Sequence, residues 1–163
     1  ADEIDYYIKE WEQYILASDI KKNLFLGIMP SSTPPTDKDG LKRLTDSTHG
    51  LPDNYHCGWT TLPKEEYEIS LPVKGINKTG NIYISFLNLP RHRFYPPRKI
   101  EISKDGAIYK TINLETDDSV EKGELVKTTT SIDLNGTELV NIKIMGSKKP
   151  RAQIGIDEIV FVP

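Results

Sequence analysis

From residue 67 onward the chain is a series of short apolar segments separated by turn signals, and this pattern restricts the fold more than any other feature. Apolar and polar side chains alternate over residues 67–71, 99–103 and 141–144, as in strands with one buried face. Residues 81–89 are more continuously apolar, which is typical of a central strand. Residues 153–162 supply a closing strand. About eight strands and no later helical pattern predict a mainly β fold, an antiparallel β-sandwich.

Two dipeptides predict tight turns between these strands. Asp105-Gly106 follows the segment 99–103, and Asn135-Gly136 precedes the segment 141–144. Aspartate or asparagine before glycine is a strong short-range signal for a two-residue hairpin. We therefore expect a β-hairpin at each of these positions.

Composition leaves room for one ordinary domain with a short appendage, because the chain has 163 residues. Its 21 basic and 24 acidic residues give a net charge of −3. No basic field exists to attract nucleic acid or anionic lipid, so neither nucleic acid nor a membrane is expected as a partner. The longest apolar runs, such as residues 159–162, are far too short to span a bilayer. The single cysteine, Cys57, excludes an internal disulfide and is expected to be a buried small hydrophobe.

Residues 2–17 have the apolar spacing of an amphipathic helix. One predicted face carries Ile4, Tyr7, Ile8, Trp11, Tyr14 and Ile15. This face packs either on the chain's own sandwich or on an upstream domain. Residues 1–20 lack the continuous apolar core of a signal peptide, which indicates cytosolic residence or a fragment of a longer precursor. We expect residues 1–22 to form a helical linker and residues 23–163 to form the sandwich, with a polar loop that lacks regular structure over residues 30–40.

Five short motifs, in order, resemble the galactose-binding-like (discoidin-type) β-sandwich family. The resemblance runs from Asn23 to the C-terminus, and Ser47 stands where the family usually has glycine. The motifs are Asn23-Leu24-Phe25-Leu26-Gly27-Ile28 with Leu44-Thr45-Asp46, then Gly58-Trp59, Glu68-Ile69-Ser70-Leu71, the segment Pro97–Gly106, and Ile156-Asp157-Glu158-Ile159-Val160-Phe161. This version of the pattern is similar to C-terminal accessory domains of bacterial β-hexosaminidase-type and related glycoside hydrolases.

The resemblance implies a fold that holds a ligand at one rim and rarely carries out chemistry. It implies a carbohydrate-binding or accessory module of a larger secreted bacterial glycoside hydrolase, with an extracytoplasmic location. The implied partners are a glycan or polysaccharide and the upstream catalytic domain of the same chain. The alternative is a structural docking domain that packs on that catalytic domain and binds no sugar. The aromatic face of residues 2–17 favours docking, and the segment 91–95 favours carbohydrate binding.

The resemblance also implies a structural calcium ion between the aspartate loop and the last strand. Calcium takes six to eight oxygen ligands, including carboxylates and backbone carbonyls. Carried over by position, Asp46 and Glu158 supply carboxylates and Thr48 supplies its carbonyl or hydroxyl, while carbonyl groups around Arg43 complete the shell. The alternative is that Asp46 caps its own turn and Glu158 pairs with a lysine. The expected role of the ion is to hold the loop in place, without a part in catalysis.

A basic and aromatic segment, residues 90–97, joins two predicted core strands. A sugar needs a ring on which its C–H face stacks and donors that its hydroxyls accept from. Arg91, His92 and Arg93 are the candidate donors, with Tyr95 or Phe94 as the platform, and an anionic sugar would gain from an arginine clamp. The alternative is a solvated basic loop in which Phe94 plugs the end of the core.

A second rim candidate is the segment 55–59, Tyr-His-Cys-Gly-Trp. His56 is a candidate ligand contact, whereas Trp59 is expected in the core. The sequence offers only generic parts for an enzyme, since it has no G-x-S-x-G elbow, no H-E-x-x-H and no phosphate-binding glycine loop. Paired carboxylates such as Glu65 and Glu66 fall in apparent turns, where they solubilise the chain. We therefore expect no catalysis in this chain.

Overall fold

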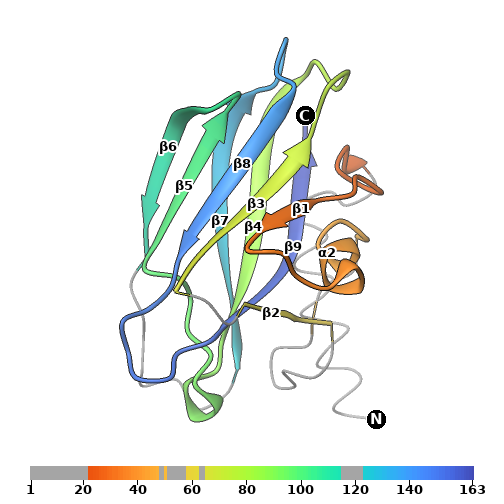
Figure 1. Cartoon of the computed structure of the whole chain (residues 1–163). Coiled ribbons are helices and arrows are strands. Elements are labelled where there is room, and N and C mark those ends of the chain that lie inside the picture. The colour runs from red at the N-terminus through yellow and green to blue at the C-terminus, as the bar shows by residue number, and fades with distance from the viewer. Residues whose placement is uncertain (1–21, 48–49, 51–57, 63–64, 115–122) are drawn as a thin grey trace.

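The computed structural model describes residues 22–47, 50, 58–62, 65–114 and 123–163. Over these residues the chain forms nine β-strands in two antiparallel sheets, one short α-helix and a 3-10 turn (Figure 1). The elements are β1 (Ser31–Thr33), α2 (Lys38–Arg43), β2 (Thr60–Leu62), β3 (Glu66–Pro72), β4 (Thr79–Asn88), η2 (Pro90–His92), β5 (Lys99–Lys104), β6 (Ala107–Asn113), β7 (Glu124–Asp133), β8 (Leu139–Met145) and β9 (Ile154–Val162). The predicted mainly β, antiparallel sandwich is confirmed.

The two sheets enclose one apolar core. The five-stranded sheet has the order β1-β3-β8-β5-β6, and the four-stranded sheet has the order β2-β9-β4-β7. Strand alternation places Ile69, Ile142 and Ile102 in one row across β3, β8 and β5, all fully buried. β4 lies between β9 and β7 and is buried on both faces over its second half, as the continuous apolar run predicts.

One predicted hairpin is confirmed and the other is wrong. Asp105-Gly106 joins β5 to β6, which pair directly, with Lys104 opposite Ala107. Asn135-Gly136 instead joins β7 to β8, which belong to different sheets. The dipeptide does make a local turn, since the Asn135 N–H donates to Asp133 Oδ1 at 2.9 Å. The long pairing of β7 with β4 decides its sheet, however, so the turn crosses from one layer to the other.

The expectation of a loop without regular structure over residues 30–40 is also wrong. β1 pairs with β3, with Ser32 opposite Ile69. α2 begins at Lys38, and the Gly40 N–H donates to the N-cap carboxylate of Asp37 at 3.2 Å. Three prolines and several hydroxyl groups suggested a loop, but an edge pairing and one helix cap suffice to order this segment.

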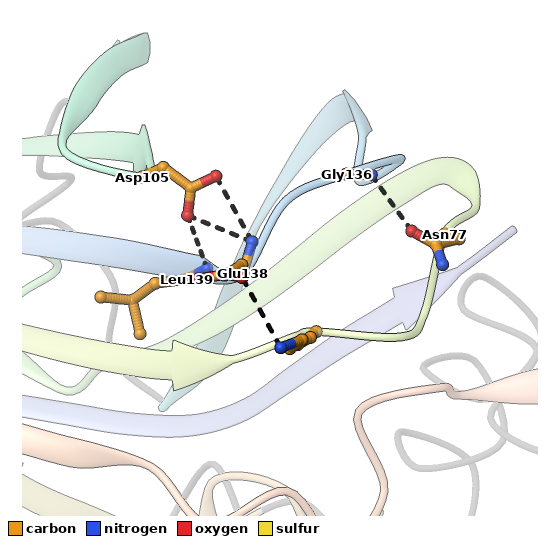
Figure 2. A network of polar contacts seen from close by, with 6 residues as sticks. Asn77, Asp105, Gly136, Glu138 and Leu139 are labelled. Atoms are coloured by element: carbon orange, nitrogen blue, oxygen red, sulfur yellow. Dashed lines mark hydrogen bonds and ion pairs between the residues drawn. The ribbon is translucent and has the colours of Figure 1, made fainter.

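The two ends of the sandwich differ. At one end, short turns are joined by the network in Figure 2, where Asp105 Oδ1 accepts from the N–H groups of Glu138 at 3.1 Å and Leu139 at 2.9 Å. Asn77 Oδ1 accepts from the Gly136 N–H in the same network. At the other end, at the foot of Figure 1, lie the longer β4–β5 and β8–β9 segments. The open loops that a ligand rim requires are therefore at this second end.

Several expectations lie outside the described residues. They concern the helix over residues 2–17 and the linker as far as residue 21, together with Thr48, His56 and Cys57. Of the helices that the described residues form, none has the length and apolarity needed to cross a bilayer.

Candidate functional site

Three carboxylates meet where the segment after α2 approaches β9. Asp46, Asp157 and Glu158 each offer a carboxylate oxygen, and these oxygens lie within 4.8 Å of one another. Asp46 is exposed, whereas Asp157 and Glu158 are 1% and 0% exposed. Buried ionised carboxylates are costly unless a positive charge compensates them. This acidic cluster therefore requires either protons or a cation.

A β-bulge in β9 lets two consecutive residues contribute to the acidic cluster. Ile84 of β4 pairs with Ile159, and Phe86 pairs with Ile156, so Asp157 and Glu158 together oppose a single residue of β4. In a regular strand, adjacent side chains point to opposite faces of the sheet, and a bulge changes the direction of one of them.

Backbone contacts hold the aspartate loop against β9. The Ile159 N–H donates to the Leu44 carbonyl at 2.7 Å, and the Ser47 N–H donates to Glu158 Oε2 at 2.6 Å. Within the described part of the chain, Asp157 Oδ1 and Glu158 Oε1 are buried and accept no hydrogen bond. Buried polar atoms normally have a partner, so these two oxygens point to an additional group in the cluster.

The pKa shifts agree with this geometry. Burial, and then the charge of Asp157, raise the pKa of Glu158 well above its usual value. Burial also raises the pKa of Asp157, while the charge of Arg43 acts in the opposite direction. Three carboxylates and one guanidinium leave two negative charges when all four groups are ionised. The residues present therefore fit a divalent cation with oxygen ligands.

The predicted sugar donors lie together on one exposed turn. η2 follows β4 and places Arg91, His92 and Arg93 at the surface. Arg93 closes the turn with a φ of 63°, and its N–H donates to the Pro90 carbonyl at 2.9 Å. Tyr95 follows on the same turn and is half-buried.

Phe94 is a packing residue, as the alternative for this segment proposed. It is 1% exposed and belongs to a small cluster with Trp59, Leu87 and Leu89, separate from the main core. A Cβ at Gly155 would lie 3.2 Å from Phe94 Cδ1, so the ring packs closely against the backbone of β9. Trp59 is 5% exposed, which confirms its expected place in the interior. Tyr95 is thus the remaining candidate platform.

The β8–β9 segment, which sequence reasoning missed, lies beside this turn. The Gln153 N–H donates to the Arg93 carbonyl at 2.8 Å, and the Tyr95 N–H donates to the Gln153 carbonyl at 3.1 Å. The Lys149 ammonium lies 5.4 Å from the centroid of the Tyr95 ring. The dense basic run of residues 148–151, Lys-Lys-Pro-Arg, was the signal that could have identified it.

A cavity of about 430 Å³ opens between this segment and the start of β3. Lys148, Lys149 and Arg151 line it together with Glu65, and Ala152 and Ile154 add apolar surface. We call the turn of residues 90–95 and the segment of residues 146–153 the basic rim. It combines several cations, a half-buried tyrosine and a concave surface.

Asp157 was the other residue that sequence reasoning did not assign to a site. Its signal was the pair of acids between Ile156 and Ile159 in an otherwise apolar strand. The acidic cluster and the basic rim involve different parts of the fold: the first joins the aspartate loop to the middle of β9, and the second lies where β4 ends and β9 begins.

The structure is similar to several solved carbohydrate-binding modules. A family 32 carbohydrate-binding module from Streptococcus pneumoniae EndoD superposes with a TM-score of 0.57 at 11% identity, covering 85% of this chain and 97% of that chain. A fucose-binding module of Streptococcus pneumoniae gives 0.53 at 12% identity, covering 86% and 94%. The lectin-binding domain of Lectinolysin, solved with Lewis b, gives 0.54 at 12% identity, covering 86% and 96%. These likenesses establish a shared fold. No protein-family model matches the chain, and no curated protein sequence matches it.

Proposed function

We propose that this chain is a non-catalytic carbohydrate-binding module of a larger secreted bacterial glycoside hydrolase, and that it binds glycan at the basic rim. The observation that carries the proposal is the convergence of the β4–β5 and β8–β9 segments on Tyr95. Arg91, His92 and Arg93 lie on the same turn as this half-buried ring. A ring with neighbouring donors is what recognition of a sugar requires.

The similar structures support the same proposal, since two of them are described as carbohydrate- or fucose-binding modules and a third was solved with the Lewis b glycan. A module of this kind acts by raising the local concentration of substrate for the attached enzyme. Weak affinity is sufficient for that effect. The proposal carries with it an extracytoplasmic location and an upstream catalytic domain in the same chain.

We assign a structural calcium ion to the acidic cluster as part of this proposal. Asp46, Asp157 and Glu158 would provide carboxylate ligands, with Thr48 and carbonyl groups near Arg43 as further candidates. The two buried carboxylate oxygens without hydrogen-bond partners support it. The ion would hold the loop after α2 against β9. It would have no part in contacting the sugar.

A glycan-array screen in calcium-containing buffer tests the proposal. Arg93→Gly is the appropriate variant because glycine adopts the observed φ of 63° without strain, whereas alanine does not. Lys110→Gln, which removes a cation from the exposed strand β6, is the charge control. We expect specific binding that Arg93→Gly weakens and Lys110→Gln leaves unchanged. No binding to any glycan on the array would contradict the proposal.

A structural docking domain is the second candidate, and a separate surface favours it. Leu24, Leu26 and Met29 are 39%, 60% and 40% exposed, and Leu26 and Met29 line a cavity of about 480 Å³ beside α2. We call these three residues the apolar patch. It begins two residues after Lys22, so an upstream domain connected through residues 1–22 would reach it directly. The occupant that this candidate requires is that upstream catalytic domain.

A further inference from the structure

We infer that the cavity in the basic rim accepts the acidic group, a carboxylate or a sulfate, of an acidic glycan. This inference rests on the proposed carbohydrate-binding function and names the class of glycan. It is carried by the charges that line the cavity and by the contacts that hold them in place.

The cavity lining has an excess of positive charge. Three of its side chains are cationic, Lys148, Lys149 and Arg151, and Glu65 is the only acid among the described residues that line it. The whole chain has a net charge of −3, so this excess is a local feature. A concave site with several cations favours an anionic ligand, and a guanidinium can bind a carboxylate or a sulfate with two parallel hydrogen bonds.

Glu65 is itself engaged by a cation outside the lining. Arg98 Nη1 lies 3.4 Å from Glu65 Oε1 and donates to the Gly146 carbonyl at 2.6 Å. The Gly146 N–H in turn donates to the Glu65 carbonyl. Arg98 therefore neutralises the acid of the cavity and joins its two walls, the start of β3 and the end of β8.

The position of the cavity suits one ligand that also contacts the turn at Arg93. Arg93 Nη1 donates to the Pro150 carbonyl at 3.4 Å, and Gln153 Nε2 donates to the His92 carbonyl at 3.5 Å. Ala152, which is partly exposed, gives the cavity an apolar surface on which the C–H face of a sugar can lie, whereas Ile154 is only 3% exposed. An acidic sugar in the cavity would thus be followed by further sugars along the turn that carries Tyr95.

The test measures binding of polygalacturonate and of its neutral methyl ester by isothermal titration calorimetry, at two salt concentrations. The test variant is Lys148→Gln/Arg151→Gln, and the control is Lys74→Gln/Lys110→Gln, which removes the same charge from exposed positions away from the basic rim. Chondroitin sulfate carries both groups, so its comparison with unsulfated chondroitin separates recognition of a sulfate from that of a carboxylate alone. Poly-glutamate is the control for charge without sugar.

We expect the acid form to bind more tightly than the ester. The test variant removes two cations and should lose at least roughly tenfold in affinity for the acid form, the loss expected for a single charge-assisted hydrogen bond. The control variant should bind as the wild type does. Equal binding of acid and ester would overturn the inference and leave the proposed function intact. Binding of poly-glutamate as tight as that of the acidic glycan would also overturn it. Failure of every glycan, neutral or acidic, would instead remove the proposed function.

Discussion

The backbone N–H of Ser47 donates a 2.6 Å hydrogen bond to Oε2 of Glu158, a residue 111 positions later in the chain. Ser47 has a φ of 63°, in the left-handed region that glycine adopts most readily. Its hydroxyl group accepts from Asn23 Nδ2 at 3.1 Å. Glycine, which the resembled family pattern has at this position, could not make this contact. Ser47 therefore connects the opening segment of the sandwich to the acidic cluster of the last strand.

Calcium is expected to stabilise the wild-type protein, because binding to the folded state alone shifts the unfolding equilibrium. The gain is about 2.7 kcal/mol when the free calcium concentration is 100 times the dissociation constant. Glu158→Gln should abolish most of this gain, since it removes a carboxylate from the cluster. Asp39→Asn, at an exposed position of α2, is the matched control. Thermal unfolding with and without calcium measures the effect, and a full calcium response in Glu158→Gln would contradict the assignment.

Without calcium, stability should fall as the pH rises above about 4, the ordinary range of Asp and Glu pKa values. Burial raises the pKa of both Asp157 and Glu158 in the folded state, so the folded protein binds more protons than the unfolded chain above that pH. Their contribution is therefore complete below the unfolded pKa values and is lost as the pH rises toward the folded ones.

The free energy of unfolding should fall by at most about 1.4 kcal/mol per pH unit for each carboxyl group that stays protonated. Saturating calcium should reduce this loss of stability, because the cation replaces the protons. Melting temperatures between pH 5 and pH 8 measure the loss with and without calcium. A slope that is the same in the wild type and in Glu158→Gln, both without calcium, would mean that the Glu158 carboxyl does not cause it.

Phe94→Ala should lower the free energy of unfolding by about 3 to 5 kcal/mol, as expected for a fully buried phenylalanine. The ring packs against Gly155 and Leu87, so its removal leaves a cavity on the outer face of the four-stranded sheet. Tyr95→Ala is the comparison, since Tyr95 is only half-buried, and it should cost less stability but weaken glycan binding. Urea unfolding of both variants gives the comparison. A larger stability loss in Tyr95→Ala would reverse these roles.

Asp105→Ala should destabilise the sandwich at the end with the short turns by about 2 kcal/mol or more. The Asp105 carboxylate accepts from two backbone N–H groups (Figure 2), and alanine also disfavours the φ of 47° at this position. Asp105→Asn keeps one acceptor oxygen and should be intermediate. Glycan binding should be unchanged in both variants, since the basic rim lies at the opposite end. Chemical denaturation together with one glycan titration measures both properties. Loss of binding in a folded Asp105 variant would place the site elsewhere.

If the chain is a docking domain, the isolated protein should self-associate through its apolar patch. Leu26→Asp should then restore the monomer, because it places a charge at the most exposed position of the patch. Ile108→Asp is the matched control, since Ile108 is 65% exposed on β6. Light scattering after size-exclusion chromatography reports the mass. A monomeric wild-type protein would count against docking. Equal effects of both variants would mean that the apolar patch is not the surface through which the protein associates.

Local patterns were enough to predict the general fold and several of its strands, although β1 was missed. Alternating side chains in β3, β5 and β8, and the long apolar run of β4, follow from which faces must be buried, and burial is a local property of each segment. The hairpin at Asp105-Gly106 was also predictable, because both of its strands lie next to the turn. The same kind of signal at Asn135-Gly136 failed, because the pairing of β7 with β4 involves residues 36 to 54 positions apart in the chain.

The sequence by itself determined a β-sandwich, one carboxylate before Ser47 and another in the last strand, and a basic turn after the central strand. Only the tertiary structure decided that Asp157 joins Asp46 and Glu158, because this depends on the bulge opposite Ser85 in β4. Only the tertiary structure placed residues 148–151 beside Arg93, because this contact is made between two loops that no local pattern pairs. Spacing along the chain predicts which side chains share a face, whereas packing between distant segments decides which of them share a site.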